Sequence, residues 1–429
     1  MVSENTRRHR VVIVGAGFGG LQTVQRLRGV PVDITLIDGR NHHLFQPLLY
    51  QLATASLSAS EIAWPIRSLV RHRPEVTTLM ATVVGVDTAS KQVCLEGGHI
   101  VRYDTLVLAT GARHGYFGHD EWEPFAPGLK TVEDAVDIRR RILLAFEQAE
   151  CETDLSRRSE LLTFAIIGAG PTGVELAGTI ADLAHDTLPP DFRRINTNQA
   201  RVLLLEAGAR VLPGYPDNLS DYARRALERL GVEVVLGRPV TKVSAQSVAF
   251  GDRRIGAGTI IWAAGVRASP AAEWLGVAAD RAGRILVNPD LTVPGHPDVF
   301  AIGDTANISR EDGTPVPGIA PAAKQGGNYV AKVIVARLAG RRALAPFHYH
   351  HQGSLAQIGK RKAVIDFGWV RLRGGIAWWL WGIAHIYFLI GMRSRLAVAL
   401  NWLWIHARNQ RSARLITQPS VPPSGVNKN

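Results

Sequence analysis

Two glycine-rich loops carry the clearest chemistry in this sequence. Val11–Gly20 reads VVIVGAGFGG, and Phe164–Gly170 reads FAIIGAG before it continues into PTG. Both fit the spacing G-x-G-x-x-G, through Gly15, Gly17, Gly20 and Gly168, Gly170, Gly173. In this spacing the first glycine permits a tight turn, the second admits a pyrophosphate, and the third lets a helix pack closely on its strand. Each loop therefore predicts a phosphate site at a helix N-terminus.

An acidic residue follows each loop at the end of a second apolar run. Asp38 ends the run ITLID at 34–38, and Glu206 ends the run VLLLE at 202–206. A carboxylate at this position accepts hydrogen bonds from an adenosine ribose. The alternative for Asp38 is an ordinary turn residue after a strand.

A third element completes each copy. Tyr103–Gly111, YDTLVLATG, and Thr259–Gly265, TIIWAAG, are apolar strands that end in Ala-x-Gly. Three elements thus occur twice in the same order, which is an internal repeat. The repeat predicts an α/β fold with two Rossmann-like dinucleotide-binding domains.

Between and after the two copies, local patterns predict further elements. Val83–Asp87 and Lys91–Leu95 predict a hairpin, and Thr131–Glu150 predicts a charged connecting helix. Asp298–Asn307 predicts a strand that runs into Gly303 and Asp304. In a protein with two dinucleotide domains, an acid at that place reaches the ribityl and pyrophosphate region of a flavin.

The positive charge lies in the C-terminal fifth of the chain. The sequence has 429 residues and a formal charge of +12. Residues 341–429 hold thirteen Lys or Arg and a single acid, Asp366, so residues 1–340 sum to zero. No helix-turn-helix, zinc or RNA-binding signature accompanies the basic residues, which argues against nucleic acid as a partner.

The same region contains an uncharged, tryptophan-rich run at Gly375–Gly391, GIAWWLWGIAHIYFLIG. Arg371, Arg373, Arg393 and Arg395 flank it. A spanning helix needs about twenty apolar residues, so the run is borderline for crossing a membrane. Aromatic residues with flanking arginines favour a helix that lies in the membrane plane on anionic lipid. A buried core helix or a dimer interface is the third interpretation.

Cysteine and histidine usage excludes several classes of site. Cys94 and Cys151 form no C-x-x-C pair and adjoin neither glycine loop, which argues against a disulfide reductase. His42 and His43 lie without metal-ligand spacing, so no metal site is predicted. No apolar segment precedes the first strand, and export is therefore not expected.

Taken together, these motifs resemble the type II NADH dehydrogenases, which are monotopic NADH:quinone oxidoreductases of the two-dinucleotide-binding flavoprotein superfamily. The resemblance covers residues 9–415 and rests on more than the glycine loops. Its specific segments are HLFQPLLYQLATASLS at 43–58, IIGAGPTGVELAG at 167–179, LLLEAGARVLP at 203–213, FAIGDTA at 300–306 and the basic aromatic tail.

The resemblance implies FAD at the first loop and NADH at the second. Asp38 would hold the FAD ribose, Val83 would meet the adenine, and Asp304 would face the ribityl chain. The remaining flavin set is Gly15, Gly17, Phe18, Gly19, Gly20, Thr110, Gly111, Ala322 and Ala323. The NADH set is Gly168, Gly170, Pro171, Thr172, Gly173, Glu206, Ala264 and Gly265. A carboxylate at Glu206 repels a 2′-phosphate, which favours NADH over NADPH.

Three residues are the catalytic candidates by the same resemblance. Glu175 would orient nicotinamide or move a proton, although a first-turn acid favoured by the helix dipole is the alternative. Lys324 and Gln325 would line the junction of flavin and quinone, although Lys324 could equally be a surface charge. The family often carries Ala-Gln-x-Ala-x-Gln here, whereas this chain reads APAAKQ at 320–325. Pro321 removes both an amide side chain and a backbone donor.

The expected organisation is an FAD-binding domain at 1–125 and 265–345, an NADH-binding domain at 126–264, and an α-helical membrane-association region at 346–429. The expected function is a non-proton-pumping NADH:quinone oxidoreductase. We expect a homodimer on the cytoplasmic face of the cell membrane that contacts anionic lipid through residues 370–414. The alternatives are a soluble NADH-dependent reductase of a protein acceptor such as ferredoxin and a non-catalytic, NADH-sensing membrane flavoprotein.

Overall fold

A computed structural model describes residues 7–341, 344–408, 410–411 and 413–417. The chain divides into two compact units, each assembled from three segments. The first unit comprises residues 1–44, 63–114 and 266–352, and the second comprises residues 45–62, 115–265 and 353–429. Residues 1–6 and 418–429, which belong to the outermost expected domains, lie outside the described residues.

The first unit is built on a six-stranded sheet with the order β20-β21-β9-β1-β2-β5. Its strands are β1 (His9–Val14), β2 (Val32–Asp38), β5 (Val76–Met80), β9 (Thr105–Leu108), β20 (Thr292–Val293) and β21 (His296–Ala301). All neighbouring strands are parallel except β20 and β21. Val11 to Val14 are buried on both faces, as a continuous β-branched run predicts for a central parallel strand.

Helices and small sheets complete the first unit. The helices are α1 (Phe18–Arg26), α4 (Ile66–Val70), α9 (Ala271–Leu275), the 3₁₀ turn η5 (Gly303–Thr305) and α10 (Ala320–Leu338). The small sheets are β3 (His42–Leu44) with β4 (Ala63–Pro65), β6 (Val83–Asp87) with β7 (Gln92–Leu95) and β8 (Ile100–Arg102), β10 (Ala112–His114) with β18 (Val266–Ala268), and β19 (Ile285–Leu286) with β22 (Ala306–Asn307). The predicted hairpin is therefore confirmed, with β8 as a third strand.

The second unit repeats the plan on a four-stranded parallel sheet with the order β13-β12-β11-β17. Its strands are β11 (Thr163–Ile167), β12 (Arg201–Leu205), β13 (Val232–Val235) and β17 (Thr259–Trp262). An antiparallel sheet of β14 (Val240–Ser244), β15 (Ser247–Phe250) and β16 (Arg253–Gly256) lies beside it in sequence. The predicted α/β fold with two Rossmann-like sheets is confirmed.

The helices of the second unit come from all three of its segments. The first segment gives η1 (Gln46–Leu48), α2 (Leu49–Ala53) and α3 (Ala59–Ile62). The middle segment gives η2 (Asp120–Trp122), α5 (Val132–Cys151), α6 (Leu155–Leu161), α7 (Pro171–Asp182), the π-turn η3 (Leu183–Thr187), η4 (Thr197–Gln199) and α8 (Asp217–Glu228). Thr131 and Asp134 form a reciprocal capping box at the start of α5, and the predicted connecting helix is confirmed.

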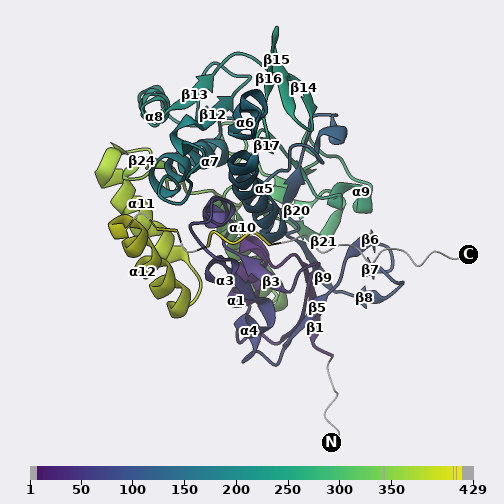
Figure 1. Ribbon diagram of the computed structural model, residues 1–429. Coiled ribbons are helices and arrows are strands. Elements are labelled where there is room, and N and C mark those ends of the chain that lie inside the picture. The colour runs from purple at the N-terminus through teal and green to yellow at the C-terminus, as the bar shows by residue number, and fades with distance from the viewer. Residues whose placement is uncertain (1–6, 342–343, 409, 412, 418–429) are drawn as a thin grey trace, which may run out of the picture. The chain divides into compact units, whose positions relative to one another are not determined.

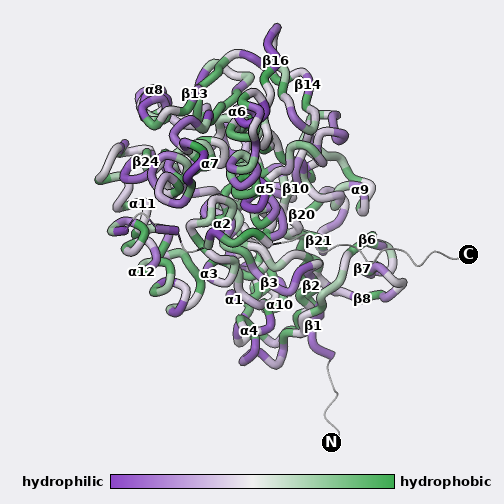
Figure 2. Tube along the Cα trace, in the orientation of Figure 1, coloured by the Kyte–Doolittle hydropathy of each residue, from purple (hydrophilic) through white to green (hydrophobic). Residues whose placement is uncertain are grey.

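The C-terminal segment of the second unit forms a small sheet and two helices. The strands are β23 (Ser354–Gly359), β24 (Lys362–Asp366) and β25 (Arg371–Arg373), followed by α11 (Gly374–Phe388) and α12 (Met392–Arg408). The two helices lie side by side (Figure 1), and Figure 2 shows hydrophobic residues along both. Among the described residues, no helix is long and apolar enough to cross a membrane.

Candidate functional site

The three glycines of the first loop meet three different steric demands. Gly15 has φ +101°, and a Cβ there would strike the carbonyl group of Ala109 at the end of β9. A Cβ on Gly20 would strike the Gly15 carbonyl, so only glycine lets α1 begin this close to β1. Gly17 is the N-cap of α1, and the space where its Cβ would lie is open. The loop thus has the tight turn, the close packing and the open approach that a pyrophosphate site needs.

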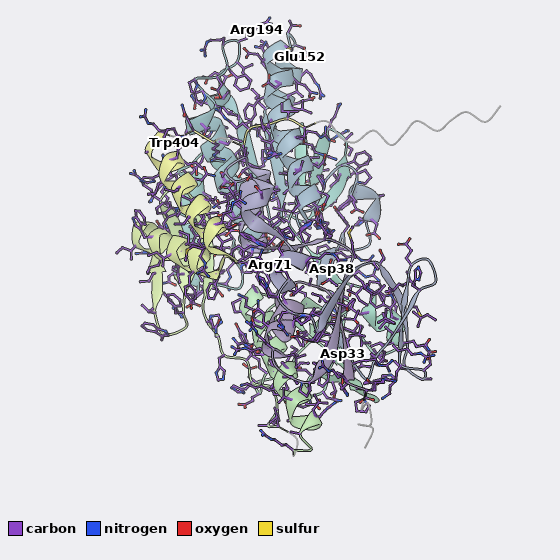
Figure 3. The ribbon with its side chains drawn as sticks, turned by 90° about the horizontal axis from the view of Figure 1, so that it is seen from below. Asp33, Asp38, Arg71, Glu152, Arg194 and Trp404 are labelled. Atoms are coloured by element: carbon purple, nitrogen blue, oxygen red, sulfur yellow. The ribbon has the colours of Figure 1, made fainter. Side chains whose placement is uncertain are left out.

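Asp38 lies at the carboxyl end of β2, whereas Asp33 lies near its start (Figure 3). The Asp38 Oδ2 accepts a 2.7 Å hydrogen bond from the Ala16 N–H, and the Asp38 Oδ1 accepts a 2.8 Å hydrogen bond from the Arg40 N–H. A carboxylate can accept about four hydrogen bonds. Asp38 therefore shapes the glycine loop and keeps capacity for a ribose hydroxyl.

A hydroxyl cluster closes the end of β9 next to this loop. Thr305 Oγ1 accepts the Gly111 N–H at 2.9 Å and lies 3.0 Å from Thr110 Oγ1, which also contacts the Ser269 hydroxyl. Gly111 has φ +70°, which explains the glycine after Thr110. Val83, at the start of β6, is buried in the core of the same unit. The first unit therefore gathers the expected strand-end residues Thr110 and Gly111 in one cluster, and it holds the expected adenine-side residue Val83 in its core.

Asp304 lies in η5, directly after β21, where the sequence predicted a flavin-facing acid. Its carboxylate accepts no hydrogen bond from the described residues. A Cβ on Gly318 would come within 2.9 Å of its Oδ1. Gly318 therefore keeps open the space beside this acid, which fits an acceptor for a bound hydroxyl.

The start of α10 packs against the first loop. A Cβ on Gly19 would come within 3.3 Å of the Ala323 carbonyl oxygen, and one on Gly303 within 3.3 Å of the Ala323 Cβ. Small residues at all three places let the loop, η5 and α10 approach one another. Ala322, the neighbour of Ala323, is buried in the core.

Lys324 lies over an aromatic side chain of the first loop. Its Nζ is 5.5 Å from the centre of the Phe18 ring, and the Phe18 ring meets the His43 ring edge-to-face at 5.1 Å. His43 Nδ1–H donates to the Ala16 carbonyl at 2.8 Å. Burial lowers the pKa of both Lys324 and His43. Lys324 is therefore a half-buried group beside the glycine loop.

Both polar atoms of the Gln325 side-chain amide form hydrogen bonds. Its Nε2 donates to the His350 carbonyl at 2.8 Å, and its Oε1 accepts the His350 N–H at 2.9 Å. This pairing holds the segment after α10 against the helix. Pro321 lies in the first turn of α10, where the backbone N–H has no helical acceptor. The proline therefore removes no hydrogen bond from α10. The glutamine side chain that the family signature often has at this position is absent.

The second loop repeats the geometry of the first. Gly168 has φ +101°, and a Cβ there would lie 2.5 Å from the Ala264 Cα at the end of β17. A Cβ on Gly173 would strike the Gly168 carbonyl, whereas the Cβ position of Gly170 is open. Gly170 is the N-cap of α7, and Pro171 and Thr172 begin that helix.

Glu206 takes the position in the second unit that Asp38 takes in the first. Its Oε2 accepts the Ala169 N–H at 2.7 Å, and its Oε1 accepts the Gly208 N–H at 2.8 Å. A Cβ on Gly265, after β17, would come within 2.6 Å of the exposed Phe117 ring. Both units thus join a glycine loop, a strand-end acid and a glycine turn at the carboxyl edge of a parallel sheet, which fits two dinucleotides.

Glu175 is buried in α7 with 8% of its surface exposed. It lies beyond the first turn of the helix, so its interpretation as a first-turn acid is wrong. Its Oε1 accepts a long, 3.4 Å hydrogen bond from the Gln357 N–H. Burial raises its pKa well above the ordinary value, whereas the Gln357 bond lowers it. The group is therefore suited to hold a proton.

A buried chain of polar side chains continues from this point. Tyr50 donates to Gln357 Oε1 at 2.5 Å, Gln51 Nε2 donates to the Tyr50 hydroxyl at 3.1 Å, and Trp402 Nε1 donates to Gln51 Oε1 at 2.8 Å. None of these four residues was among the sequence candidates. Tyr50 and Gln51 belong to HLFQPLLYQLATASLS at 43–58, one of the segments on which the family resemblance rests. The partner Gln357 had no sequence signal.

The two cysteines lie in ordinary positions. Cys94 is on β7 of the first unit, and Cys151 ends α5 in the second unit. Both are free thiols.

Comparisons with known proteins agree with this geometry. Residues 9–327 match the family model described as pyridine nucleotide-disulphide oxidoreductase, and residues 351–407 match the NDH2 C-terminal domain. A relative from Mycobacterium tuberculosis named type II NADH:quinone oxidoreductase Ndh is 45% identical, over 96% of this chain and 91% of its own. The type II NADH:quinone oxidoreductase of Staphylococcus haemolyticus is 32% identical, over 83% and 89%.

Solved structures share the fold. NDH2 from Plasmodium falciparum, solved in complex with NADH, has a TM-score of 0.88 at 21% identity and covers 96% of this chain and 100% of its own. The sulfide:quinone oxidoreductase of Aquifex aeolicus has a TM-score of 0.70 at 18% identity, over 90% and 91%.

Proposed function

This chain belongs to the type II NADH:quinone oxidoreductases, and we propose that it passes reducing equivalents from NADH through FAD to a membrane quinone without pumping protons. The observation that carries the proposal is the duplicated loop. Ala16 N–H binds Asp38 in one unit and Ala169 N–H binds Glu206 in the other, each at 2.7 Å. Two dinucleotide sites are what a flavoprotein that oxidises NADH needs.

We assign FAD to the first unit and NADH to the second. When bound, FAD accepts a hydride from NADH and gives two electrons to the quinone. In the first unit Gly17 leaves room for the pyrophosphate, Asp38 accepts a ribose hydroxyl, and Asp304 accepts a ribityl hydroxyl. In the second unit Gly170 and Pro171 form the start of α7, where the NADH pyrophosphate would bind. Glu206 would accept hydrogen bonds from the ribose hydroxyls of NADH.

Three side chains serve the chemistry in this proposal. Glu175 holds a proton on its carboxyl oxygen, because burial favours the neutral acid. Lys324 supplies positive charge beside Phe18 and the first loop, which favours an electron-rich flavin. Gln325 acts through position, since both of its amide ends bind the His350 backbone.

We further propose that α11 and α12 attach the protein to the membrane without crossing it. Large apolar side chains of the two helices are exposed: Ile376, Trp379, Leu380, Ile383, Tyr387, Phe388, Met392, Leu396, Leu400, Leu403 and Trp404. Arg371, Arg373, Arg393, Arg395 and Arg408 border them in sequence. Exposed aromatic and aliphatic residues with flanking arginines suit an in-plane helix on anionic lipid. We also propose that the protein attaches to the cytoplasmic face of the cell membrane and that it is a homodimer.

The electron acceptor decides between this function and its alternatives. The flavin of the purified, FAD-loaded protein is first reduced with NADH and then mixed with a soluble quinone analogue or with an acidic iron–sulfur protein. The proposal predicts rapid reoxidation by the quinone. Reoxidation by the iron–sulfur protein alone would favour the ferredoxin-type reductase, and failure of NADH to reduce the flavin would favour a sensor.

A further inference from the structure

A cavity of about 80 Å³ lies in the second unit between the C-terminal helices and α7. Trp378 and Trp381 of α11 and Trp402 of α12 form one side. Asp182 at the end of α7 and Arg411, which follows α12, also line it. None of these residues is part of the glycine-loop sites. The cavity combines an aromatic wall with buried charged groups.

Unpartnered hydrogen-bond donors surround this cavity. Among the residues that the structure describes, Trp378 Nε1, Trp381 Nε1 and Arg411 Nε are buried and have no hydrogen-bond partner. His406, another lining residue, lies 2.9 Å from an Arg361 guanidinium nitrogen through its Nε2. Since guanidinium only donates, the neutral His406 ring carries its hydrogen on Nδ1. That buried nitrogen also has no partner within the described part of the chain. All four groups are donors, and the acceptors that line the cavity, including the Asp182 and Asp186 carboxyl groups, form no hydrogen bond with them.

Arg411 places a buried positive charge at the cavity. Only 6% of its surface is exposed, and its two terminal nitrogens donate to the carbonyls of Thr54 at 2.8 Å and Thr179 at 3.2 Å. Within the described residues no carboxylate forms an ion pair with it. A buried guanidinium stays charged; Asp182 and Asp186 stabilise this charge without an ion-pair contact, and the Arg411 Nε is left without a hydrogen-bond partner among the described residues. The missing partner is therefore a group with acceptor oxygens, and the charge of Arg411 favours an anionic one.

The two acids near the cavity do not supply that partner by contact. Asp182 Oδ2 accepts the Lys360 N–H at 2.7 Å; burial raises the pKa of Asp182, whereas Arg411 and the Lys360 hydrogen bond lower it. Asp186 also lines the cavity, but it is exposed to solvent. The nearby carboxyl groups leave the contact position on Arg411 open.

The size of the cavity limits the ligand. A water-sized group needs about 10–15 Å³ of such volume, so 80 Å³ takes a few atoms of water size. Sites for drug-sized ligands are several times larger. A tetrahedral phosphate fits this limit, whereas a whole nucleotide does not.

We propose that this cavity binds a phosphate group through Arg411 and that a phospholipid head group supplies it. The outer faces of α11 and α12 expose Trp379, Ile383, Leu403 and Trp404, which places a lipid source close to the site if these helices contact the membrane. The lipid source rests on the proposed membrane attachment, whereas phosphate binding does not. Failure of membrane binding would thus leave the phosphate site standing.

The test measures binding of two soluble probes to delipidated, FAD-loaded full-length protein by titration calorimetry. The probes are inorganic phosphate and glycerophosphoethanolamine, which carries the head group without acyl chains. We expect saturable binding to the wild type and at least tenfold weaker binding to Arg411→Gln. The matched control is Arg224→Gln, because Arg224 pairs with Glu228 on α8 and does not line the cavity. This control is expected to bind like the wild type.

A second variant, Trp378→Phe, keeps the test informative if Arg411→Gln fails to fold. Trp378→Phe removes one donor and keeps an aromatic ring, and we expect it to weaken binding several-fold. Tighter binding of glycerophosphoethanolamine than of phosphate identifies a lipid head group, whereas equal binding identifies free phosphate and overturns the lipid source. No saturable binding of either probe to the wild type, or wild-type binding by both variants, overturns the site.

Discussion

The Tyr50 hydroxyl donates a 2.5 Å hydrogen bond to Gln357 Oε1, although 307 positions separate the two residues. The Gln357 N–H in turn contacts Glu175. Two segments that flank the second glycine loop in sequence thereby meet at one buried carboxyl group. Burial and, after it, the neighbouring Glu175 raise the pKa of the Tyr50 hydroxyl, so Tyr50 stays protonated and acts as the donor in this contact.

Glu175 should make the protein less stable as pH rises. Its folded pKa is raised, so above the ordinary value of 4.5 the unfolded chain loses this proton while the folded chain keeps it. Stability therefore falls through this window by up to about 1.4 kcal/mol per pH unit. Glu175→Gln should remove that slope, which denaturant unfolding at several pH values measures. The same slope in both proteins would contradict the assignment.

Glu206 should set the choice between NADH and NADPH. Glu206→Gln keeps an oxygen that can accept the Ala169 N–H but removes the charge that repels a 2′-phosphate. We expect the ratio of kcat/KM for NADPH over NADH to rise about tenfold, equivalent to about 1.4 kcal/mol. Asp38→Asn is the matched control, since it should weaken FAD binding and leave this ratio unchanged. An unaltered ratio in Glu206→Gln would refute the role.

The two loops should fail in different ways when their first glycine is replaced. Gly15→Ala and Gly168→Ala each introduce strain at φ +101° and a clash with the neighbouring strand end. We expect Gly15→Ala to purify with little FAD, and Gly168→Ala to retain FAD that NADH no longer reduces. Gly39→Ala, where a Cβ meets open space, should behave as wild type. Loss of FAD in both variants would count against two separate sites.

Membrane attachment should depend on the outer faces of α11 and α12. Ile383→Asp and Leu403→Asp change exposed side chains, so the fold should tolerate them. A buried aliphatic side chain contributes about 1.5–3 kcal/mol, and each change should reduce binding to anionic vesicles at least tenfold in a flotation assay. The control is Ile100→Asp, an exposed residue of β8. Equal flotation of all variants would argue against this surface.

Truncation would be a weaker test of the same surface. Trp402 donates to Gln51 and Asn401 donates to the Ser56 carbonyl, so α12 also supports the interior of the second unit. Removal of residues 370–429 would lose these contacts together with the exposed face. Single substitutions separate the two effects.

The glycine loops were predictable because their constraints are local. Gly15 and Gly168 need a positive φ, and each third glycine faces a carbonyl five residues earlier, so sequence spacing alone specifies the geometry. The acids Asp38 and Glu206 were predictable for the same reason, since each ends a strand next to its loop. The hydrogen bonds that they accept from Ala16 and Ala169 were not part of the expectation.

Long-range pairings were not predictable. Gln357 has no motif of its own and acquires its place only because β23 packs against α7. Gln325 matched a family signature, but its amide binds the His350 backbone, which the signature does not reveal. Residues 45–62 group with the second unit rather than with the glycine loop that precedes them. These outcomes depend on tertiary packing, which single-sequence patterns do not encode.

The most direct test of the proposed function is a single turnover of the FAD-loaded protein without oxygen. A stoichiometric amount of NADH is added while the flavin absorbance is followed, and a soluble quinone analogue is added afterwards. We predict that NADH bleaches the flavin and that the quinone restores the oxidised spectrum with formation of the quinol. A flavin that NADH does not bleach, or that stays reduced in the presence of quinone, would contradict the account.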